Sequence, residues 1–448
     1  MIKNNIASVE NNNTAGSLAL LGARAPRDSF VASRLRAAGA VLLGKTGLSQ
    51  WANFRSSNSS NGWSAHGGQV RGVYIQDQDP SGSSSGSGVA ASLGLAAACL
   101  GTETDGSILS PAQRSGVVGI KPTVGLTSRD MVIPISEHQD TVGPMASSVK
   151  SAAYILQAIA GQDANDNYTS AIPSSIPTLP DYVAACKPGA LGGARLGVPS
   201  NVLELFLSFD NSSIPEVDAF QSALDIIRGA GSTVVLGTNF TNLTEWAASD
   251  SEGIVLRSDF ISPTGLAGYL SKLAFNPNNI TSLADVARFT KTVAPGPEEF
   301  PSRNTATWDQ ALDPATGFDN TDPRFFPVLQ ENLFLGGEGG LLGALERHNL
   351  DAIILPTSFA PGFAAIVGAP VITVPLGFYP ADAPKIMDRR GELVDTGPNV
   401  PFGISFLGRR FDEANLIGLA YAFEQATKVR GKVKPYLVPG TELPRKGR

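Results

Sequence analysis

Residues 79–126 read DPSGSSSGSGVAASLGLAAACLGTETDGSILSPAQRSGVVGIKPTVGL and consist mainly of small side chains. A loop of serine and glycine leads into an alanine-rich segment, which predicts a buried helix whose small side chains allow close packing. The GTETDGS that follows predicts a second tight loop. GVVGIKP then predicts a core strand that ends at Pro122. The stretch therefore predicts a loop, a helix, a second loop and a strand packed at close distance.

Other apolar segments predict the rest of the core. The strand candidates are DAIILPT (351–357), GAPVITVPLGF (368–378) and PFGISFLG (401–408). DEANLIGLAYAFEQATKVR (412–430) predicts a final helix with one apolar face, acids at its start and bases at its end. Because helical patterns alternate with apolar strands, we expect an α/β fold with a mixed central sheet flanked by helices.

The bulk composition excludes several classes of partner. The net charge is -6 and no basic block occurs, so neither nucleic acid nor an anionic membrane is an expected partner. The longest apolar run, residues 89–100, is too short to span a bilayer. Seven N-x-[ST] sequons, one of them at Asn211, hint at secretion. We expect a soluble protein, secreted if a missing leading segment carried a signal peptide and cytoplasmic otherwise.

Residues 38–47, AGAVLLGKTG, match the phosphate-loop pattern G-x-x-x-x-G-K-[ST]. Residues 28–39 predict a short helix that ends at Gly39, and AVLL after it predicts a strand that ends at Gly44. A phosphate loop needs its strand before the first glycine and a flexible turn between the glycines. The order of elements therefore disfavours nucleotide binding.

A second pattern, G-x-S-x-G at residues 82–86, would make Ser84 the nucleophile of an α/β-hydrolase. That motif needs an apolar strand before it, but IQDQDP precedes it here. The three histidines, His66, His138 and His348, lie in no metal-ligand spacing such as H-E-x-x-H. We therefore expect no metal and no cofactor. A hydrolase without a histidine base can use a lysine that burial keeps neutral.

Residues 79–130 closely resemble the signature region of the amidase signature family of serine amidohydrolases. The other segments that carry the resemblance are TAGSLALLG (14–22), AGAVLLGKTGLSQWANFRS (38–56), DTVGPMA (140–146), GAPVITVP (368–375) and PFGISFLG (401–408). The resemblance frames nearly the whole chain. It implies one amidase domain over 1–448, with a signature core (1–160), a variable substrate-side region (161–345) and a return to the core (346–448).

The family works through a Ser-Ser-Lys triad. By resemblance, the nucleophile falls on Ser107, the bridging serine with a cis peptide bond on Ser83, and the lysine on Lys3. Neutral Lys3 would take a proton from Ser83, which takes one from Ser107 as that hydroxyl attacks the amide carbonyl. The relay then reverses to protonate the leaving amine, and water hydrolyses the acyl-enzyme.

The resemblance also implies an oxyanion hole. Its donors would be the backbone N–H groups of Thr104, Asp105, Gly106 and Ser107. Gly106 would let the chain turn tightly enough to present them. The supporting loop would include Gly82 and Ser84.

The expected function is hydrolysis of a small-molecule amide to a carboxylate and ammonia or an amine. Members of the family usually carry a longer segment before the lysine than the two residues that precede Lys3. We therefore expect this sequence to be an N-terminally truncated version of a longer protein. Two alternatives stay open: a catalytically inactive remnant of the same fold, and the glutamine-hydrolysing subunit of a tRNA-dependent amidotransferase. Neither the amide that is cleaved nor the oligomeric state is predicted.

Overall fold

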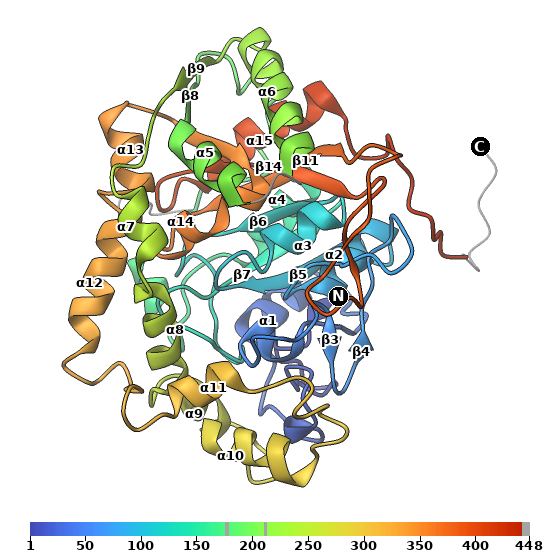
Figure 1. Ribbon diagram of the computed structural model, residues 1–448, viewed down its shortest axis with the longest axis vertical. Helices are drawn as coiled ribbons and strands as arrows, with labels where there is room; N and C mark the ends of the chain where they lie inside the picture. Colours follow the sequence, from blue (N-terminus) through green and yellow to red (C-terminus); the bar gives the residue numbers. More distant parts are fainter. Residues whose placement is uncertain (175–178, 210–212, 441–448) are drawn as a thin grey trace.

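A mixed sheet of ten strands forms the centre of the molecule (Figure 1). The computed structural model describes residues 1–174, 179–209 and 213–440, so the sequon at Asn211 lies outside the described residues. The strands pair in parallel at both ends of the sheet and antiparallel in its middle. Their order across the sheet is β2 (Lys45–Thr46), β1 (Ile2–Lys3), β5 (Ala98–Glu103), β7 (Thr141–Ala146), β6 (Val118–Lys121), β11 (Val371–Phe378), β14 (Pro401–Leu407), β10 (Ala352–Pro356), β8 (Arg195–Val198) and β9 (Thr233–Leu236).

Helices cover both faces of this sheet. One face packs against α2 (Ser85–Leu93), α3 (Leu109–Arg114) and α6 (Ile214–Gly229), which lie in front of the sheet in Figure 1. The other face packs against α4 (Val149–Ile159) and α15 (Glu413–Thr427). The central strands β10, β11 and β14 are buried along nearly their whole length and read as apolar runs, because helices exclude water from each face of the sheet.

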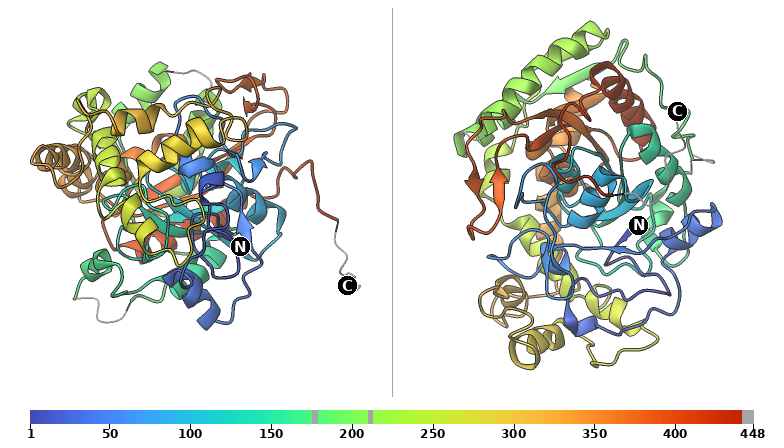
Figure 2. Two further views of the ribbon diagram at one scale, coloured as in Figure 1. Left: turned by 90° about the horizontal axis from the view of Figure 1, so that it is seen from below. Right: turned by 90° about the vertical axis from the view of Figure 1, so that its right-hand side faces the viewer.

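A smaller apolar cluster joins the beginning of the chain to a distant segment. In Figures 1 and 2 the blue residues up to about 55 lie beside the yellow helices α9 to α11. Trp51 and Trp308 meet edge to face, with ring centroids 5.9 Å apart.

The other helices and turns are η1 (Leu18–Leu20), α1 (Phe30–Ala37), η2 (Gln50–Asn53), η3 (Asn167–Ala171), α5 (Ser200–Phe209), α7 (Leu243–Ala248), α8 (Ser251–Ile261), α9 (Leu266–Ser271), α10 (Leu283–Arg288), η5 (Phe289–Val293), α11 (Ala306–Ala311), α12 (Phe325–Gly336), α13 (Leu341–Arg347), η6 (Thr357–Phe359) and α14 (Pro361–Ala365). Two small hairpins pair β3 (Trp63–Ser64) with β4 (Gly68–Gln69), and β12 (Ile386–Met387) with β13 (Val394–Thr396).

Several elements expected from the sequence are confirmed. Strands β6, β10, β11 and β14 and helix α15 lie in the stretches that predicted them. The helix expected near residues 28–39 is α1, which Ser29 caps through the N–H of Ala32, and Gly39 follows it with a φ of +83°. Among the described residues, no helix has the length and apolar character needed to cross a membrane.

Two local predictions are wrong. The stretch AVLL is not a strand: Val41 and Leu43 are 80% and 61% exposed, and the strand β2 begins only after Gly44. The alanine-rich stretch is not one helix, because Gly94 ends α2 in the left-handed conformation and Ala98–Glu103 continues as β5. Its small residues therefore serve two elements, and sequence periodicity alone did not separate them.

We expect Arg55→Met to destabilise the fold strongly. Arg55 and Glu298 are 2% and 0% exposed and form an ion pair of 3.1 Å. Glu298 also accepts hydrogen bonds from Ser17, Leu18 and Gln50. Removal of the arginine leaves this carboxylate buried and short of a counter-charge, which costs about 3–5 kcal/mol of unfolding free energy.

Chemical denaturation of this variant measures the loss. Arg36→Met is the control, because Arg36 forms an exposed pair with Glu10 at 2.6 Å and its loss costs below about 1 kcal/mol. Equal stability of the two variants would contradict the structural role of the buried pair.

Candidate active site

Lys3 lies on β1, between β2 and β5, and its side chain is fully buried. Its Nζ donates to Ser83 Oγ at 2.6 Å, to Thr102 Oγ1 at 2.9 Å and to the carbonyl of Thr102 at 3.2 Å. Parallel pairing with β5 places Thr102 next to β1, since Ile2 pairs with Leu100, and Ser83 lies on the loop before α2. The structure therefore joins Lys3 and Ser83, which are 80 residues apart in the chain.

The environment of Lys3 favours its neutral form. Burial lowers its pKa from 10.5 to about 7, although the carboxylates of Asp140 and Glu103 favour the charged form. Neutral and charged lysine are thus both populated near pH 7, the state that proton transfer at this pH requires.

Ser83 and Ser84 follow a cis peptide bond between Gly82 and Ser83. Both serines are fully buried. The backbone N–H of Ser84 donates to the carbonyl of Ser107 at 3.1 Å, which links this loop to the second one. The Ser84 hydroxyl donates to the carbonyl of Thr102 at 3.1 Å and accepts from its N–H at 3.3 Å. Ser84 thus holds β5, and its burial contradicts a role as the nucleophile of an α/β-hydrolase.

Gly82 lies in close contact with its surroundings. A Cβ atom at this position would lie 2.3 Å from Ser49 Oγ and 3.0 Å from Asn53 Nδ2. A side chain here would therefore displace the loop that carries Ser83. This explains why glycine precedes the serine in the sequence.

Ser107 lies on the turn between β5 and α3. Gly106 makes this turn with a φ of +78°, which a residue with a Cβ rarely adopts. Ser107 is 8% exposed, and its hydroxyl makes no hydrogen bond within the described residues. Its hydroxyl is therefore available to a bound molecule. Within the same residues, no hydrogen bond joins Ser83 and Ser107 directly, so their link is the backbone bond from Ser84.

Glu103 shapes the donors of this turn. Its Oε2 accepts from the N–H groups of Ile108 at 2.6 Å and Leu109 at 2.9 Å, and the N–H of Gly106 also favours its charged form. Within the described ranges, the N–H groups of Thr104, Asp105 and Ser107 donate to no protein acceptor. These three groups are the open donors on the turn.

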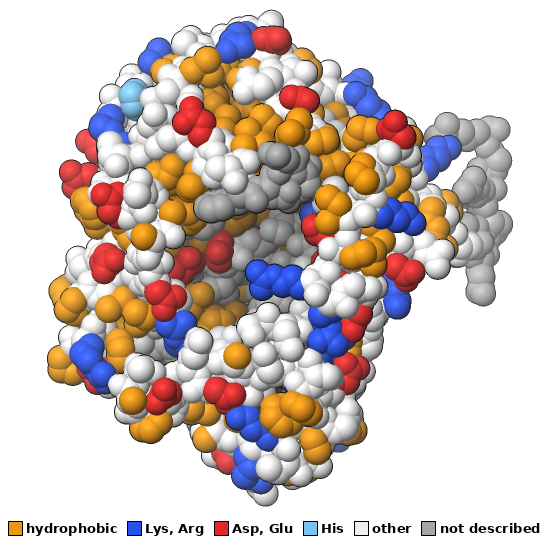
Figure 3. All heavy atoms as spheres, in the orientation of Figure 1, with side chains coloured by type: hydrophobic (Ala, Val, Ile, Leu, Met, Phe, Trp, Pro, Cys, Tyr) orange, Lys and Arg blue, Asp and Glu red, His pale blue; other side chains and the backbone are white. Residues whose placement is uncertain are grey.

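An acidic pair lies beside this turn. The side chain of Asp105 reaches solvent, yet the surrounding protein displaces much of its water. This loss of water, with Glu252 and Glu103 nearby, raises the pKa of its carboxyl well above the usual range. Gln139 donates to Glu252 at 2.7 Å. The face in Figure 3 is hollowed near its centre, and acidic side chains line one wall of the hollow.

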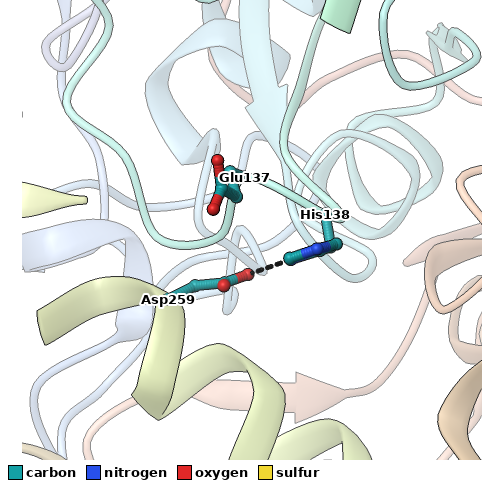
Figure 4. Close-up of side chains that lie close together, drawn as sticks. All are labelled: Glu137, His138 and Asp259. Atoms are coloured by element: carbon teal, nitrogen blue, oxygen red, sulfur yellow. Dashed lines mark hydrogen bonds and ion pairs between the residues drawn. The ribbon is translucent and has the colours of Figure 1, made fainter. Parts of the chain in front are cut away.

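Glu137, His138 and Asp259 form a separate cluster (Figure 4). Its carboxylates already accept hydrogen bonds: Asp259 from His138 at 2.8 Å and from Ser136 at 2.5 Å, and Glu137 from Asn320 at 2.6 Å. These contacts join the loop before β7 to α8 and to the loop between α11 and α12, which carries Asn320. The arrangement is that of a structural hydrogen-bond network.

The phosphate-loop pattern has no phosphate-binding geometry. The Lys45 ammonium donates to the carbonyl of Ile6 and to Asn13 Oδ1 at 3.2 Å, so it is directed into the protein. Burial lowers its pKa to about 7. The disfavoured nucleotide-binding interpretation therefore receives no support from the structure.

Three further groups contact the site and were not predicted from the sequence. Thr102 accepts from Lys3, Glu103 fixes the turn before α3, and Asp140 accepts from Thr104 Oγ1 at 2.5 Å. The first two lie within GTETDGS, and the third begins DTVGPMA. Both segments resemble the amidase signature family, but no linear pattern indicates that β5 and β7 are neighbours.

Comparisons with known proteins agree with this arrangement. Residues 1–246 match the family described as Amidase. A putative amidase of Arthroderma benhamiae is 55% identical over 444 residues, which cover 99% of this chain and 73% of that protein. A glutamyl-tRNA(Gln) amidotransferase subunit of Acidobacterium capsulatum is 32% identical, over 93% of this chain and 82% of that protein.

Among solved structures, the native peptide amidase of Stenotrophomonas maltophilia is similar with a TM-score of 0.83. It is 37% identical, over 97% of this chain and 84% of that chain. The fold comparison and the sequence comparisons therefore point to the same family. The chain belongs to the amidase family and is a hydrolase of carbon–nitrogen bonds in carboxylic amides.

Proposed function

We propose that this protein hydrolyses its amide through an acyl-enzyme on Ser107, with Ser83 and Lys3 as the proton relay. The observation that carries the proposal is the 2.6 Å hydrogen bond between Lys3 Nζ and Ser83 Oγ, formed by a fully buried lysine. A buried lysine with a pKa of about 7 can accept a proton, whereas an exposed one remains charged. This environment argues against an inactive remnant.

The relay moves one proton in each direction. Neutral Lys3 accepts the proton of Ser83, Ser83 accepts that of Ser107, and Ser107 Oγ bonds to the amide carbonyl carbon. The proton then returns through Ser83 to the amide nitrogen as the carbon–nitrogen bond breaks. Water attacks the ester by the same relay and releases the carboxylate. The link between Ser83 and Ser107 must form during the reaction, and catalytic hydrogen bonds often tighten only when substrate is bound.

The turn of residues 104–107 supplies the oxyanion hole in this proposal. The open N–H groups of Thr104, Asp105 and Ser107 are its main donors. Gly106 provides the conformation, while its own N–H favours the charge of Glu103. Fixed donors of this kind stabilise the negative charge that develops on the carbonyl oxygen.

We infer that the substrate is a peptide that carries a carboxamide. The support is the similarity to peptide amidase, with a TM-score of 0.83 at 37% identity. The alternative, glutamine hydrolysis within a tRNA-dependent amidotransferase, has weaker support because the similar amidotransferase protein is 32% identical. Ammonia release from peptide amides by the isolated chain, without further proteins, separates the two activities.

A fluorophosphonate probe tests the nucleophile. We expect one adduct per chain, located on Ser107 by peptide mass spectrometry, and no adduct in Ser107→Ala. The matched control is Ser84→Ala, which should still label because the Ser84 hydroxyl is directed at Thr102. An adduct on Ser84, or a folded chain with no adduct, would contradict the assignment.

A further inference from the structure

Asp140 is a buried carboxylate that the proposed relay does not use. It is 9% exposed and lies at the residue before β7. Its Oδ1 accepts from Thr104 Oγ1 at 2.5 Å, and its Oδ2 accepts from the N–H groups of Ile135 at 2.7 Å and Ser136 at 3.1 Å. The carboxylate therefore has a fixed position between two loops.

Thr104 is the first residue of the turn that ends at Ser107. The antiparallel register of β5 and β7 pairs Glu103 with Thr141, so Thr104 and Asp140 are the next residues beyond this pair. Gln139 donates to the carbonyl of Thr104 at 3.4 Å. Thr104, at the start of the turn, is thus held through both its side-chain hydroxyl and its backbone carbonyl.

Asp140 is also one of the carboxylates whose charge acts on Lys3. Thr102, which accepts from Lys3, lines a small cavity of about 10 Å³ together with Thr104 and Asp140. The buried atoms between the two charges screen them poorly, so their attraction is stronger than it would be in water. Of the charges that face Lys3, Asp140 makes the larger contribution and Glu103 the smaller, and both favour the ammonium form.

The charge on Asp140 is itself set by its surroundings. Burial raises its pKa to about 6, while the hydrogen bond from Thr104, the two backbone N–H groups and the guanidinium of Arg129 lower it. The carboxylate is therefore charged at pH 7 and above. Without the negative charge of Asp140, burial would lower the pKa of Lys3 further and make Lys3 a weaker base.

We propose that Asp140 is a positioning residue for amide hydrolysis. It holds Thr104 at the start of the nucleophile turn, and its negative charge sets the pH range over which Lys3 accepts a proton. This inference rests on the proposed function of Lys3 and Ser107.

The test is the pH dependence of kcat/KM in Asp140→Asn. The amide keeps the shape of the carboxylate and can accept from Ile135 and Ser136, but it carries no charge. We expect the acidic limb of the profile to shift to lower pH by about 1 unit, because loss of a nearby opposite charge favours neutral lysine. An unshifted limb in a folded variant would overturn the proposal.

Thr104→Val is the matched variant, since it removes the hydroxyl and leaves the charge. We expect kcat to fall by about 10-fold, with the acidic limb unmoved, and Thr104→Ser to restore kcat. This pair also tests the positioning role if Asp140→Asn does not fold, because equal kcat in Thr104→Val and the parent would contradict it. Activity retained in Lys3→Met would instead refute the proposed function itself, whatever the Asp140 profile.

Discussion

Ser107→Ala is expected to lower kcat for amide hydrolysis by about 10⁴-fold or more, because removal of a nucleophile leaves only the contribution of substrate binding and of the oxyanion hole. The hydroxyl of Ser107 makes no hydrogen bond within the described part of the chain, so its loss breaks no internal contact. Circular dichroism and the unfolding midpoint should therefore match those of the parent. Ammonia release from a peptide amide, followed at saturating substrate, measures the loss.

Ser84→Ala is the control for this substitution. Its hydroxyl bonds to Thr102 on both its donor and acceptor sides, so the variant loses two internal hydrogen bonds but no reacting atom. We expect Ser84→Ala to lower stability while it keeps the larger part of the activity. The reverse pattern, an active Ser107→Ala and an inactive Ser84→Ala, would assign the nucleophile to Ser84.

The second large effect is expected for Lys3→Met, which should lower kcat/KM by about 10³-fold through loss of the general base. Methionine fills similar space and has no charge to bury. In the parent, the pKa of Lys3 falls from 10.5 when unfolded to about 7 when folded, so the unfolded chain binds more protons between these values. The parent therefore gains stability as the pH rises from 7 to 10.5, and the variant loses this contribution. Denaturation at pH 7 and pH 9 measures the difference.

Lys45→Met is the matched control, because the chain has a second lysine on the neighbouring strand. Lys45 pairs with Ile2 across β1 and β2, and burial lowers its pKa to about 7 as well. Among the described residues, it donates to Ile6 and Asn13 and to no serine. We expect Lys45→Met, like Lys3→Met, to lose part of the gain in stability that the parent shows as the pH rises above 7. Unlike Lys3→Met, it should retain activity. If both variants lost activity equally, burial of a lysine in this region, and not the contact with Ser83, would explain the Lys3 result.

The sequence predicted the central strands well where the pattern was unambiguous. β10, β11 and β14 are continuous apolar runs bounded by proline or glycine, and a buried strand leaves this pattern whichever strands lie beside it. β8 and β9 were not predicted within the variable region. β9 has no buried residue, so burial left it no apolar pattern to find.

The contact between Lys3 and Ser83 was predicted only through resemblance to a family. On its own, a lysine near the start of a sequence carries no pattern of burial. The burial follows from the insertion of β1 between β2 and β5, a long-range pairing that local periodicity does not contain. The role of Asp140 was missed for the same reason, since only the register of β5 and β7 places it beside Thr104.

The place of β1 within the sheet has a consequence for biosynthesis. Its neighbour β5 ends at Glu103, so a nascent chain on the ribosome carries Lys3 as an ordinary charged ammonium until about one hundred further residues have emerged and folded over it. Both the serine partner and the loss of water around the lysine arrive with that later segment. The neutral lysine that can accept a proton near pH 7 is therefore a product of folding, and an incomplete chain has neither the relay nor its reactivity toward amides.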